Sequence, residues 1–371
     1  MKYPLLVPTM PTVAQLQPYL QKIDDNRWYT NFGPLNSELE ARLGQALQVK
    51  EQGLSITSVA ECTAGLELAL QAHGLPVGAR VLTPSLTFVA TGTAIVRSGY
   101  TPVFADVDPA AWILTPAVAE AALATTHFDA VMPVSTFGAE QDVQGWAEFA
   151  RKHGKPVIID AAGSFGNQRV CPGVTVVFSL HATKSLGAGE GGAVIGTHAV
   201  VDRIRRLANF GIEVSTGLVD EAGTNAKLSE YHAAVGLASM DMWESIKSAR
   251  RVLRTRYLAA LRSADLPIQL QALPENGVYP TFPVALAEGI NSHWVIEKLT
   301  AAGIGTRRWY CPPLHEHKAF AAYDCAGDLP VTASLGKRIV GIPFHLHLLD
   351  GAVDEIVELF GRILASAGQA D

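Results

Sequence analysis

The middle of the chain alternates short, almost continuously apolar runs with longer segments in which apolar residues recur at helical spacing. Apolar runs of this kind are typical of strands that are covered on both faces of a sheet. We predict strands at residues 80–83, 102–105, 130–134, 157–160, 174–179 and 192–195, and helices at 64–72, 89–98, 116–124 and 144–152. Strands that alternate with helices indicate βα units and a mostly parallel sheet, so the predicted fold class is α/β.

A longer helical pattern runs from about residue 229 to residue 264 and predicts the connection to a second domain. At 371 residues the chain is also longer than a typical single core. We therefore predict a large domain over residues 1–240 and a smaller C-terminal α+β domain over residues 241–371.

Composition and charge narrow the class of protein. Apolar residues make up 48% of the chain and charged residues 17%, which is typical of a compact globular protein. The net charge of −6 provides no basic surface for nucleic acid, and no apolar stretch is long enough to cross a bilayer. The N-terminus lacks the pattern of a signal peptide. We expect a cytoplasmic protein with neither a nucleic-acid nor a membrane partner.

Cysteines and histidines do not follow a metal-binding pattern. The four cysteines have no CxxC spacing, and the pair His315 with His317 lacks an evident third and fourth ligand nearby, as does the pair His345 with His347. We therefore expect reduced thiols and no metal site.

Polar residues at the ends of the apolar runs are the first candidates for chemistry, because parallel sheets bind ligands at the carboxyl ends of their strands. Asp160 and Ser179 each end such a run, and Lys184 follows Ser179 just before a glycine-rich segment. An enzyme that uses pyridoxal 5′-phosphate (PLP) needs a lysine for a Schiff base, an acid against the pyridine nitrogen and donors for the phosphate. This set of residues offers all three.

The expected roles follow from the chemistry of each group. Asp160 would hold the pyridinium, and Lys184 would form the Schiff base and then act as general acid and base. Ser179 would bind the phosphate together with the start of a helix at Thr63 and Ala64, where unpaired amides favour anions. Phe88 would stack on the ring.

Each residue alone also has a structural interpretation: a turn or cap for Asp160 and Thr63, a surface position for Lys184 and a core position for Phe88. Their joint order along the chain favours the cofactor site. Gly187, Gly189 and Gly192 satisfy the G-x-G-x-x-G pattern of a dinucleotide-binding dehydrogenase. That pattern should join a strand to a helix, whereas here it leads into a predicted strand.

At these residues the sequence resembles the DegT/DnrJ/EryC1/StrS aminotransferases, PLP enzymes of fold type I (aspartate aminotransferase-like) that act mainly on nucleotide-linked keto sugars. The match covers nearly the whole chain. Its strongest part is the segment FSLHATK at residues 178–184, followed by EGGA at 190–193. Further matches are TNFGP at 30–34, PSLTFVAT at 84–91, PVFADVD at 102–108 and GTNAKLSE at 223–230. Two positions depart from the family pattern: Gly163 stands where Gln or His is usual, and Cys62 where Gly is usual.

The resemblance implies several contacts. Lys184 carries the cofactor, and Asn225 reaches the phosphate of the neighbouring subunit's cofactor, which makes a homodimer the minimal active unit. The implied substrate-binding residues are Asn31, Gly33, His181, Glu190, Arg307, Arg308, Tyr310 and His315.

The implied reaction is a ping-pong transamination. L-glutamate would convert the cofactor to pyridoxamine 5′-phosphate, and the amino group would then pass to a keto sugar, with a dTDP-4-keto-6-deoxy sugar favoured. The alternatives are a keto-cyclitol without a nucleotide and a PLP-binding regulatory protein without catalysis. Lys184 argues against the dehydratase branch of the family, in which His replaces that lysine.

Overall fold

A computed structural model describes residues 1–367 of the chain. The larger part is built around a sheet of two hydrogen-bonded groups of strands, in the orders β1-β7-β6-β5 and β3-β2-β4. Parallel bridges from Val131 to Val157 and from Val134 to Asp160 join β4 to β5, so the two groups form one sheet. The strands are β1 (Ser55–Val59), β2 (Arg80–Pro84), β3 (Thr101–Ala105), β4 (Ala130–Val131), β5 (Ile158–Asp160), β6 (Thr175–Ser179) and β7 (Gly192–Gly196).

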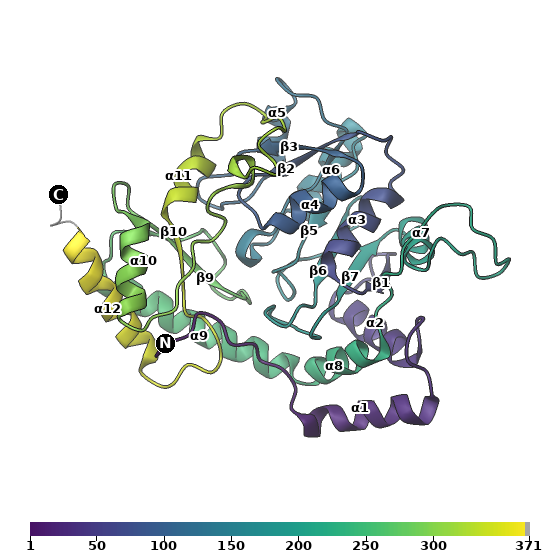
Figure 1. Cartoon of the computed structure of the whole chain (residues 1–371), viewed down its shortest axis with the longest axis horizontal. Helices are drawn as coiled ribbons and strands as arrows, with labels where there is room; N and C mark the ends of the chain where they lie inside the picture. The colour runs from purple at the N-terminus through teal and green to yellow at the C-terminus, as the bar shows by residue number, and fades with distance from the viewer. Residues whose placement is uncertain (368–371) are drawn as a thin grey trace.

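Only β7 runs against its neighbours in this part of the described chain; the pairs β2–β3, β2–β4 and β5–β6 are parallel. Helices cover both faces of the sheet (Figure 1), which confirms the predicted α/β class. The helices of this part are α1 (Val13–Asn26), α2 (Pro34–Ala46), α3 (Cys62–Ala72), α4 (Val89–Arg97), α5 (Pro116–Ala122), α6 (Val143–His153), α7 (His198–Ala208) and α8 (Glu230–Asp241), with the short 3-10 turn η1 (Thr136–Gly138).

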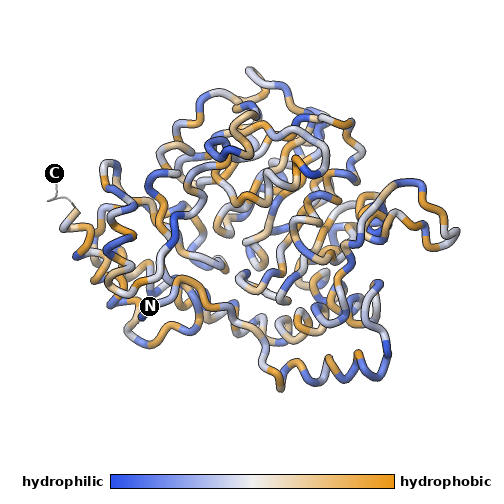
Figure 2. The backbone as a smooth tube through the Cα atoms, in the orientation of Figure 1, coloured by the Kyte–Doolittle hydropathy of each residue, from blue (hydrophilic) through white to orange (hydrophobic). Residues whose placement is uncertain are grey.

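Two apolar clusters explain why the strands are apolar on both faces. Val176 and Phe178 of β6 pack with α1, α2, α5, α6 and α8, whereas Val177 between them packs with α3, α4 and α7. Successive residues of a strand point to opposite faces, so a strand covered on both sides must be apolar throughout. The outer helices are amphipathic by contrast, and Figure 2 shows hydrophobic and hydrophilic residues alternating along α1.

The smaller part of the fold has its own sheet of order β10-β9-β8, antiparallel throughout. Residues of α9, α10 and α12 cover it and form a separate apolar cluster. The elements are α9 (Trp243–Ala264), β8 (Ile268–Gln269), β9 (Phe282–Leu286), α10 (Ser292–Ala301), η2 (Leu314–Glu316), α11 (Pro330–Arg338), β10 (Ile339–Ile342) and α12 (Ala352–Ala367).

Two predicted elements differ from the structure, and one strand has no counterpart in the prediction. The strand predicted at 130–134 is limited to Ala130–Val131, because residues beyond it pair only through an isolated bridge. The helix predicted from 229 to 264 is two helices, α8 and α9, because the amide of Met242 turns back to Ser239 O (3.1 Å) and the buried Trp243 then packs on Phe165. Strand β1 was not predicted.

The chain also begins beside its C-terminal part. Tyr3 bridges to Ile304 and is buried within the smaller apolar cluster. The first residues therefore lie with the smaller part of the fold, and the division of the chain at residue 240 stays a prediction.

Candidate active site

Asp160 and Ser179 end neighbouring parallel strands, so both lie at the carboxyl edge of the central sheet. The Asp160 carboxylate is only 4% exposed and accepts hydrogen bonds from Thr91 Oγ1 (2.8 Å) and the Ala162 amide (3.1 Å). The Ser179 hydroxyl accepts from the amide of His181 (3.2 Å). Thr91 carries no signal of this role in the sequence, because it lies seven residues after the end of β2 and reaches Asp160 only through the fold.

Burial raises the pKa of Asp160, and the hydrogen bonds from Thr91 and Ala162 and the charge of Lys184 oppose this only in part. A cation placed against the carboxylate would offset the cost of burying its charge. The site therefore fits a positively charged ring nitrogen as the missing partner of Asp160.

Lys184 lies in a loop that returns from β6 to the antiparallel strand β7. The loop is held by backbone hydrogen bonds from Leu180 to Gly191 O (2.8 Å) and from Ala182 to Gly189 O (2.9 Å). Burial and the charge of Asp160 raise the pKa of the Cys62 thiol, while Lys184 opposes them, so these three side chains lie within electrostatic reach of one another.

Cys62 is the first residue of helix α3. The uncapped amides at this end of the helix face the region of Asp160 and Lys184. The N-cap residue, Glu61, makes no side-chain cap hydrogen bond with any described residue, and the first amide bonded within the helix is that of Gly65, to Glu61 O (3.1 Å). The amides of Thr63 and Ala64 are therefore available to an anion, which the helix dipole also favours.

Close packing of β7 against the start of α3 supports this arrangement. A Cβ atom on Gly192 would lie 2.9 Å from Val59 Cγ2, 3.0 Å from Phe178 O and 3.1 Å from Cys62 Cα. Only glycine allows β7 to pass so close to the start of α3. At Gly163, by contrast, a Cβ would make ordinary contacts of 3.4 Å or more, so crowding does not explain that glycine.

Phe88 occupies the N-cap position of α4, one turn before Thr91, and its side chain is half exposed. An exposed aromatic residue at the edge of a buried polar site suits a flat ligand that would cover it. A buried carboxylate, a nearby lysine, an uncapped helix start and an aromatic side chain together fit PLP. No cluster of three or more His, Cys, Asp or Glu side chains in residues 1–367 could hold a metal ion.

The α/β fold with these groups at the carboxyl edge of its sheet defines a PLP-dependent enzyme of fold type I. The chain belongs to the DegT/DnrJ/EryC1/StrS aminotransferase family, whose model matches residues 12–360. It is therefore an aminotransferase, and its cofactor is pyridoxal 5′-phosphate.

Relatives match the chain over nearly its full length. It is 30% identical to the dTDP-4-amino-4,6-dideoxy-D-glucose transaminase of Escherichia coli over 371 residues, 96% of this chain and 97% of that protein. The structure of DesI in the presence of its TDP-sugar product has a TM-score of 0.88 at 32% identity, covering 100% of this chain and 97% of that one. A DegT DnrJ EryC1 StrS aminotransferase from Brucella abortus has a TM-score of 0.85 at 28% identity, covering 95% of each chain.

Two of the predicted substrate-binding residues, Tyr310 and His315, lie beside this site. Tyr310 is in electrostatic reach of Asp160: burial raises the pKa of its phenol, and the charge of Asp160 adds to the effect. The Tyr310 ring stacks on Phe137 with centroids 5.0 Å apart. His315 is fixed by a hydrogen bond between its Nδ1 and Ser85 Oγ (2.6 Å), at the carboxyl end of β2.

Four further predicted substrate-binding residues differ in their surroundings. His181 and Glu190 face each other across the Lys184 loop at 3.7 Å, and both are substantially exposed. The Arg307 guanidinium lies over the Trp309 ring at 5.0 Å. Arg308 instead donates to Gly336 O (3.2 Å) and contacts His293 Nε2 (2.7 Å). Because its guanidinium is already bonded within the smaller part of the fold, Arg308 is a weaker candidate for binding a substrate anion.

Asn225 is exposed in the segment between α7 and α8 that projects from the fold (Figure 1). Its amide oxygen accepts from Lys227 Nζ (2.6 Å), and its backbone bridges to Asn209. Both partners belong to the same projecting segment, so a contact with a cofactor phosphate stays a prediction for this residue.

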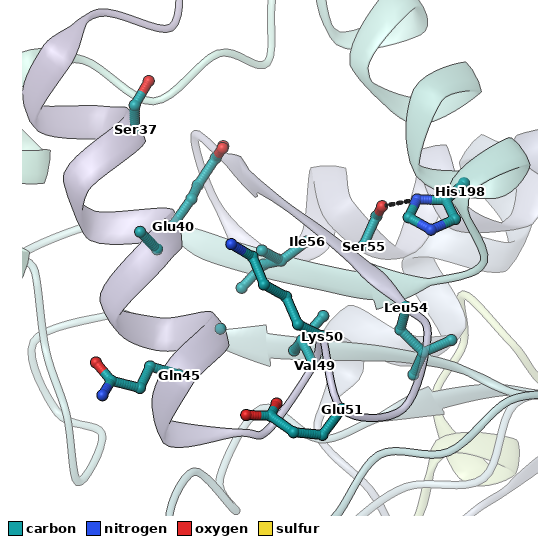
Figure 3. Close-up of a pocket in the computed structure, with 12 residues that line it drawn as sticks. Ser37, Glu40, Gln45, Val49, Lys50, Glu51, Leu54, Ser55, Ile56 and His198 are labelled. Atoms are coloured by element: carbon teal, nitrogen blue, oxygen red, sulfur yellow. Dashed lines mark hydrogen bonds between the residues drawn. The ribbon is translucent and has the colours of Figure 1, made fainter.

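A cavity of about 570 Å³ lies elsewhere, between α2, β1 and α7. Figure 3 shows Lys50 reaching into it and Ser55 bonded to His198 on its far wall. None of the residues predicted for cofactor or substrate lines this cavity.

Proposed function

We propose that this chain moves an amino group from L-glutamate to a nucleotide-linked keto sugar, with a 4-keto-6-deoxy sugar as the acceptor. The names of two relatives support the sugar: one is a dTDP-4-amino-4,6-dideoxy-D-glucose transaminase, and DesI was solved with its TDP-sugar product. The observation that carries the amino-transfer chemistry is the buried Asp160 carboxylate in electrostatic reach of Lys184.

Each residue has a definite task in this proposal. When bound, PLP supplies an electron sink for negative charge on the carbon next to the transferred nitrogen. Lys184 holds the cofactor through Nζ and, once released from it, takes and returns a proton at the same atom. Asp160 keeps the ring nitrogen positively charged. The amides of Thr63 and Ala64 and the hydroxyl of Ser179 hold the phosphate, and Phe88 shields one face of the ring from water.

The two substrates are expected to use one pocket in turn. Tyr310 and His315 come from the smaller part of the fold and face the carboxyl edge of the sheet, where the sugar would lie against them. Arg307 is the better of the two adjacent arginines for a diphosphate, since Arg308 is already engaged.

A homodimer with shared sites is part of the proposal. The projecting segment that carries Asn225 also exposes Phe210 (50%), Leu218 (62%) and Val219 (55%). Exposed apolar side chains gathered on one segment favour a protein partner, and a second copy of the chain would cover them while Asn225 reaches its cofactor.

The absorption spectrum of the purified protein with PLP, before and after addition of L-glutamate, tests the donor reaction. We expect the band of lysine-bound cofactor to be replaced by that of pyridoxamine phosphate, and Lys184→Ala to lack the first band. Calorimetry with dTDP and UDP then tests the acceptor. If neither nucleotide binds, a ketone without a nucleotide, such as a keto-cyclitol, replaces the proposed substrate.

A further inference from the structure

Helix α2 begins without the means to cap itself. Its N-cap residue is Gly33, which has no side chain, and Pro34 follows at the first helical position without an amide hydrogen. The next two amides, those of Leu35 and Asn36, both donate to the carboxylate of Glu230, each at 2.8 Å. Glu230 lies in the first turn of α8, 195 residues after Leu35, and is only 1% exposed.

Glu230 also holds the chain just before α2. Its own amide donates to Tyr29 O (3.0 Å), so one residue binds both sides of the turn at residues 30–34. Within this turn Asn31 has φ 61° and Phe32 has φ 55°. Residues other than glycine seldom adopt this left-handed backbone conformation twice in succession. Such a conformation persists only where the surroundings impose it.

The space around Gly33 shows how closely the carboxylate fits. A Cβ atom there would lie 2.7 Å from Glu230 Cδ and 2.6 Å from Trp28 Cδ1. Gly33 is therefore required by the approach of Trp28 and Glu230 and not by its own backbone conformation, which is extended.

A second set of contacts, partly buried, joins the same turn to β1, the strand that precedes α3. The Phe32 ring lies under the Arg205 guanidinium at 4.1 Å, and Arg205 pairs with Glu40 at 2.9 Å. Glu40 of α2 lies at the wall of the cavity in Figure 3, and its carboxylate accepts a hydrogen bond from the Ser58 amide at 2.8 Å. Ser58 belongs to β1, the strand that runs directly into the proposed phosphate-binding helix.

Asn36 links the two sets. Its amide donates to Glu230 and its side-chain nitrogen donates to Ser58 Oγ at 2.7 Å. The segment with Asn225 enters the same assembly, because Ala226 O accepts from the Ala60 amide at 2.7 Å, between β1 and α3. Glu230 thus contacts the Asn31–Gly33 turn directly. It is linked through Asn36 to β1, which leads into the proposed phosphate-binding helix α3, and the projecting segment contacts the same region.

We propose that Glu230 is a positioning residue that holds the turn at Asn31–Gly33 in the shape that receives the acceptor sugar. This inference rests on the proposed function for the identity of the acceptor and on the predicted contact of Asn31 and Gly33 with it. Glu230 touches neither reacting atoms nor cofactor in this proposal; it acts through the two amides of α2 and the carbonyl of Tyr29. Its removal should therefore weaken the acceptor reaction and leave the glutamate reaction intact.

The test compares Glu230→Gln with the wild-type holoenzyme and with Glu244→Gln. Glutamine keeps the volume but offers one acceptor oxygen where two amides donate. Glu244, in the first turn of α9, has an 80% exposed side chain, so its substitution is a matched control. The KM is measured in the reverse direction, with dTDP-4-amino-4,6-dideoxy-D-glucose as amino donor and 2-oxoglutarate as amino acceptor. Amide hydrogen exchange of residues 29–36 is measured in parallel.

In Glu230→Gln we expect faster exchange at residues 29–36 and a KM for the sugar raised about tenfold or more, as small misplacements of binding groups produce. The rate of the spectral change with L-glutamate should stay within about twofold of wild type, which also shows that the variant is folded and loaded. Glu244→Gln should match wild type in all three measurements.

If amide hydrogen exchange at residues 29–36 is unchanged in Glu230→Gln, then Glu230 does not hold the turn and the proposal is overturned. Faster exchange with an unchanged sugar KM would overturn the positioning role, because the turn would then lie outside the sugar site. A wild-type enzyme that ignores the dTDP-sugar would contradict the proposed acceptor, and that failure is seen in the wild type before any variant is compared.

Discussion

Replacing Asp160 by Asn should change activity and stability in opposite directions. The side chain keeps its shape, and its oxygen can still accept a hydrogen bond from Thr91 or Ala162. What it loses is the negative charge proposed to face the ring nitrogen. An ion pair at about 3 Å with an effective dielectric constant of about 20 contributes about 5 kcal/mol. An amide retains part of this interaction, so we expect a loss of about 10³-fold in rate, about 4 kcal/mol.

The stability of the cofactor-free protein should respond with the opposite sign. Burial raises the pKa of Asp160, so the folded state binds a proton more tightly than the unfolded chain. Asp160 therefore contributes stability at low pH that is lost as pH rises through its folded pKa. At neutral pH the buried charge is a cost, and the asparagine variant without PLP should be at least as stable as wild type.

Single-turnover absorbance with L-glutamate measures the rate, and thermal unfolding of the cofactor-free protein at neutral and acid pH measures the stability. Asp106→Asn is the matched control, since Asp106 follows the end of β3 and accepts from the amides of Val331 and Thr332. It should lose stability without the selective loss of chemistry. A rate for Asp160→Asn within tenfold of wild type would refute the proposed ring contact.

Three further outcomes are expected. Mixing inactive Lys184→Ala with Asn225→Ala should restore part of the activity by forming hybrid dimers, and no recovery would count against a shared site. Burial lowers the pKa of His73 to about 4, so stability should fall as pH drops from 6.5 towards that value. The loss should reach about 3 kcal/mol, and His73→Gln should flatten the pH profile of unfolding. Gly192→Ala should cost about 2 kcal/mol or more by overpacking against Val59, and equilibrium dialysis should show weaker PLP retention; normal retention would contradict the packing argument.

The central strands and the residues that end them could be predicted because both are encoded locally. An apolar run that stops at Asp160 or Ser179 shows in the sequence where a strand meets a site. Strand β1 could not be predicted this way, since Thr57 and Ser58 make it look like a polar loop. Their burial is possible because Glu40, from another element, accepts the hydrogen bonds of Ser58.

The break at Met242 has a similar cause. Neither glycine nor proline marks it, and the helical pattern continues through it. The break follows from the packing of Trp243 on Phe165, a contact between residues far apart in the chain. Thr91 and Glu230 were not singled out for the same reason: each acts on a group that only the complete fold brings near.

The reversed strand β7 has a consequence for how the site assembles. Because β6 and β7 are antiparallel, Lys184 lies in the return formed by residues 180–191 between these adjacent strands and not on a crossover through a helix. The pairing of β6 with β7 is local in sequence and therefore has low contact order. Asp160 joins the site through the pairing of β5 with β6, which is nearly as local, whereas the amides at the start of α3 reach it only through the pairing of β1 with the distant strand β7. The lysine and the carboxylate are thus carried by a locally determined piece of the sheet, and the phosphate-binding amides arrive when β1 pairs with it.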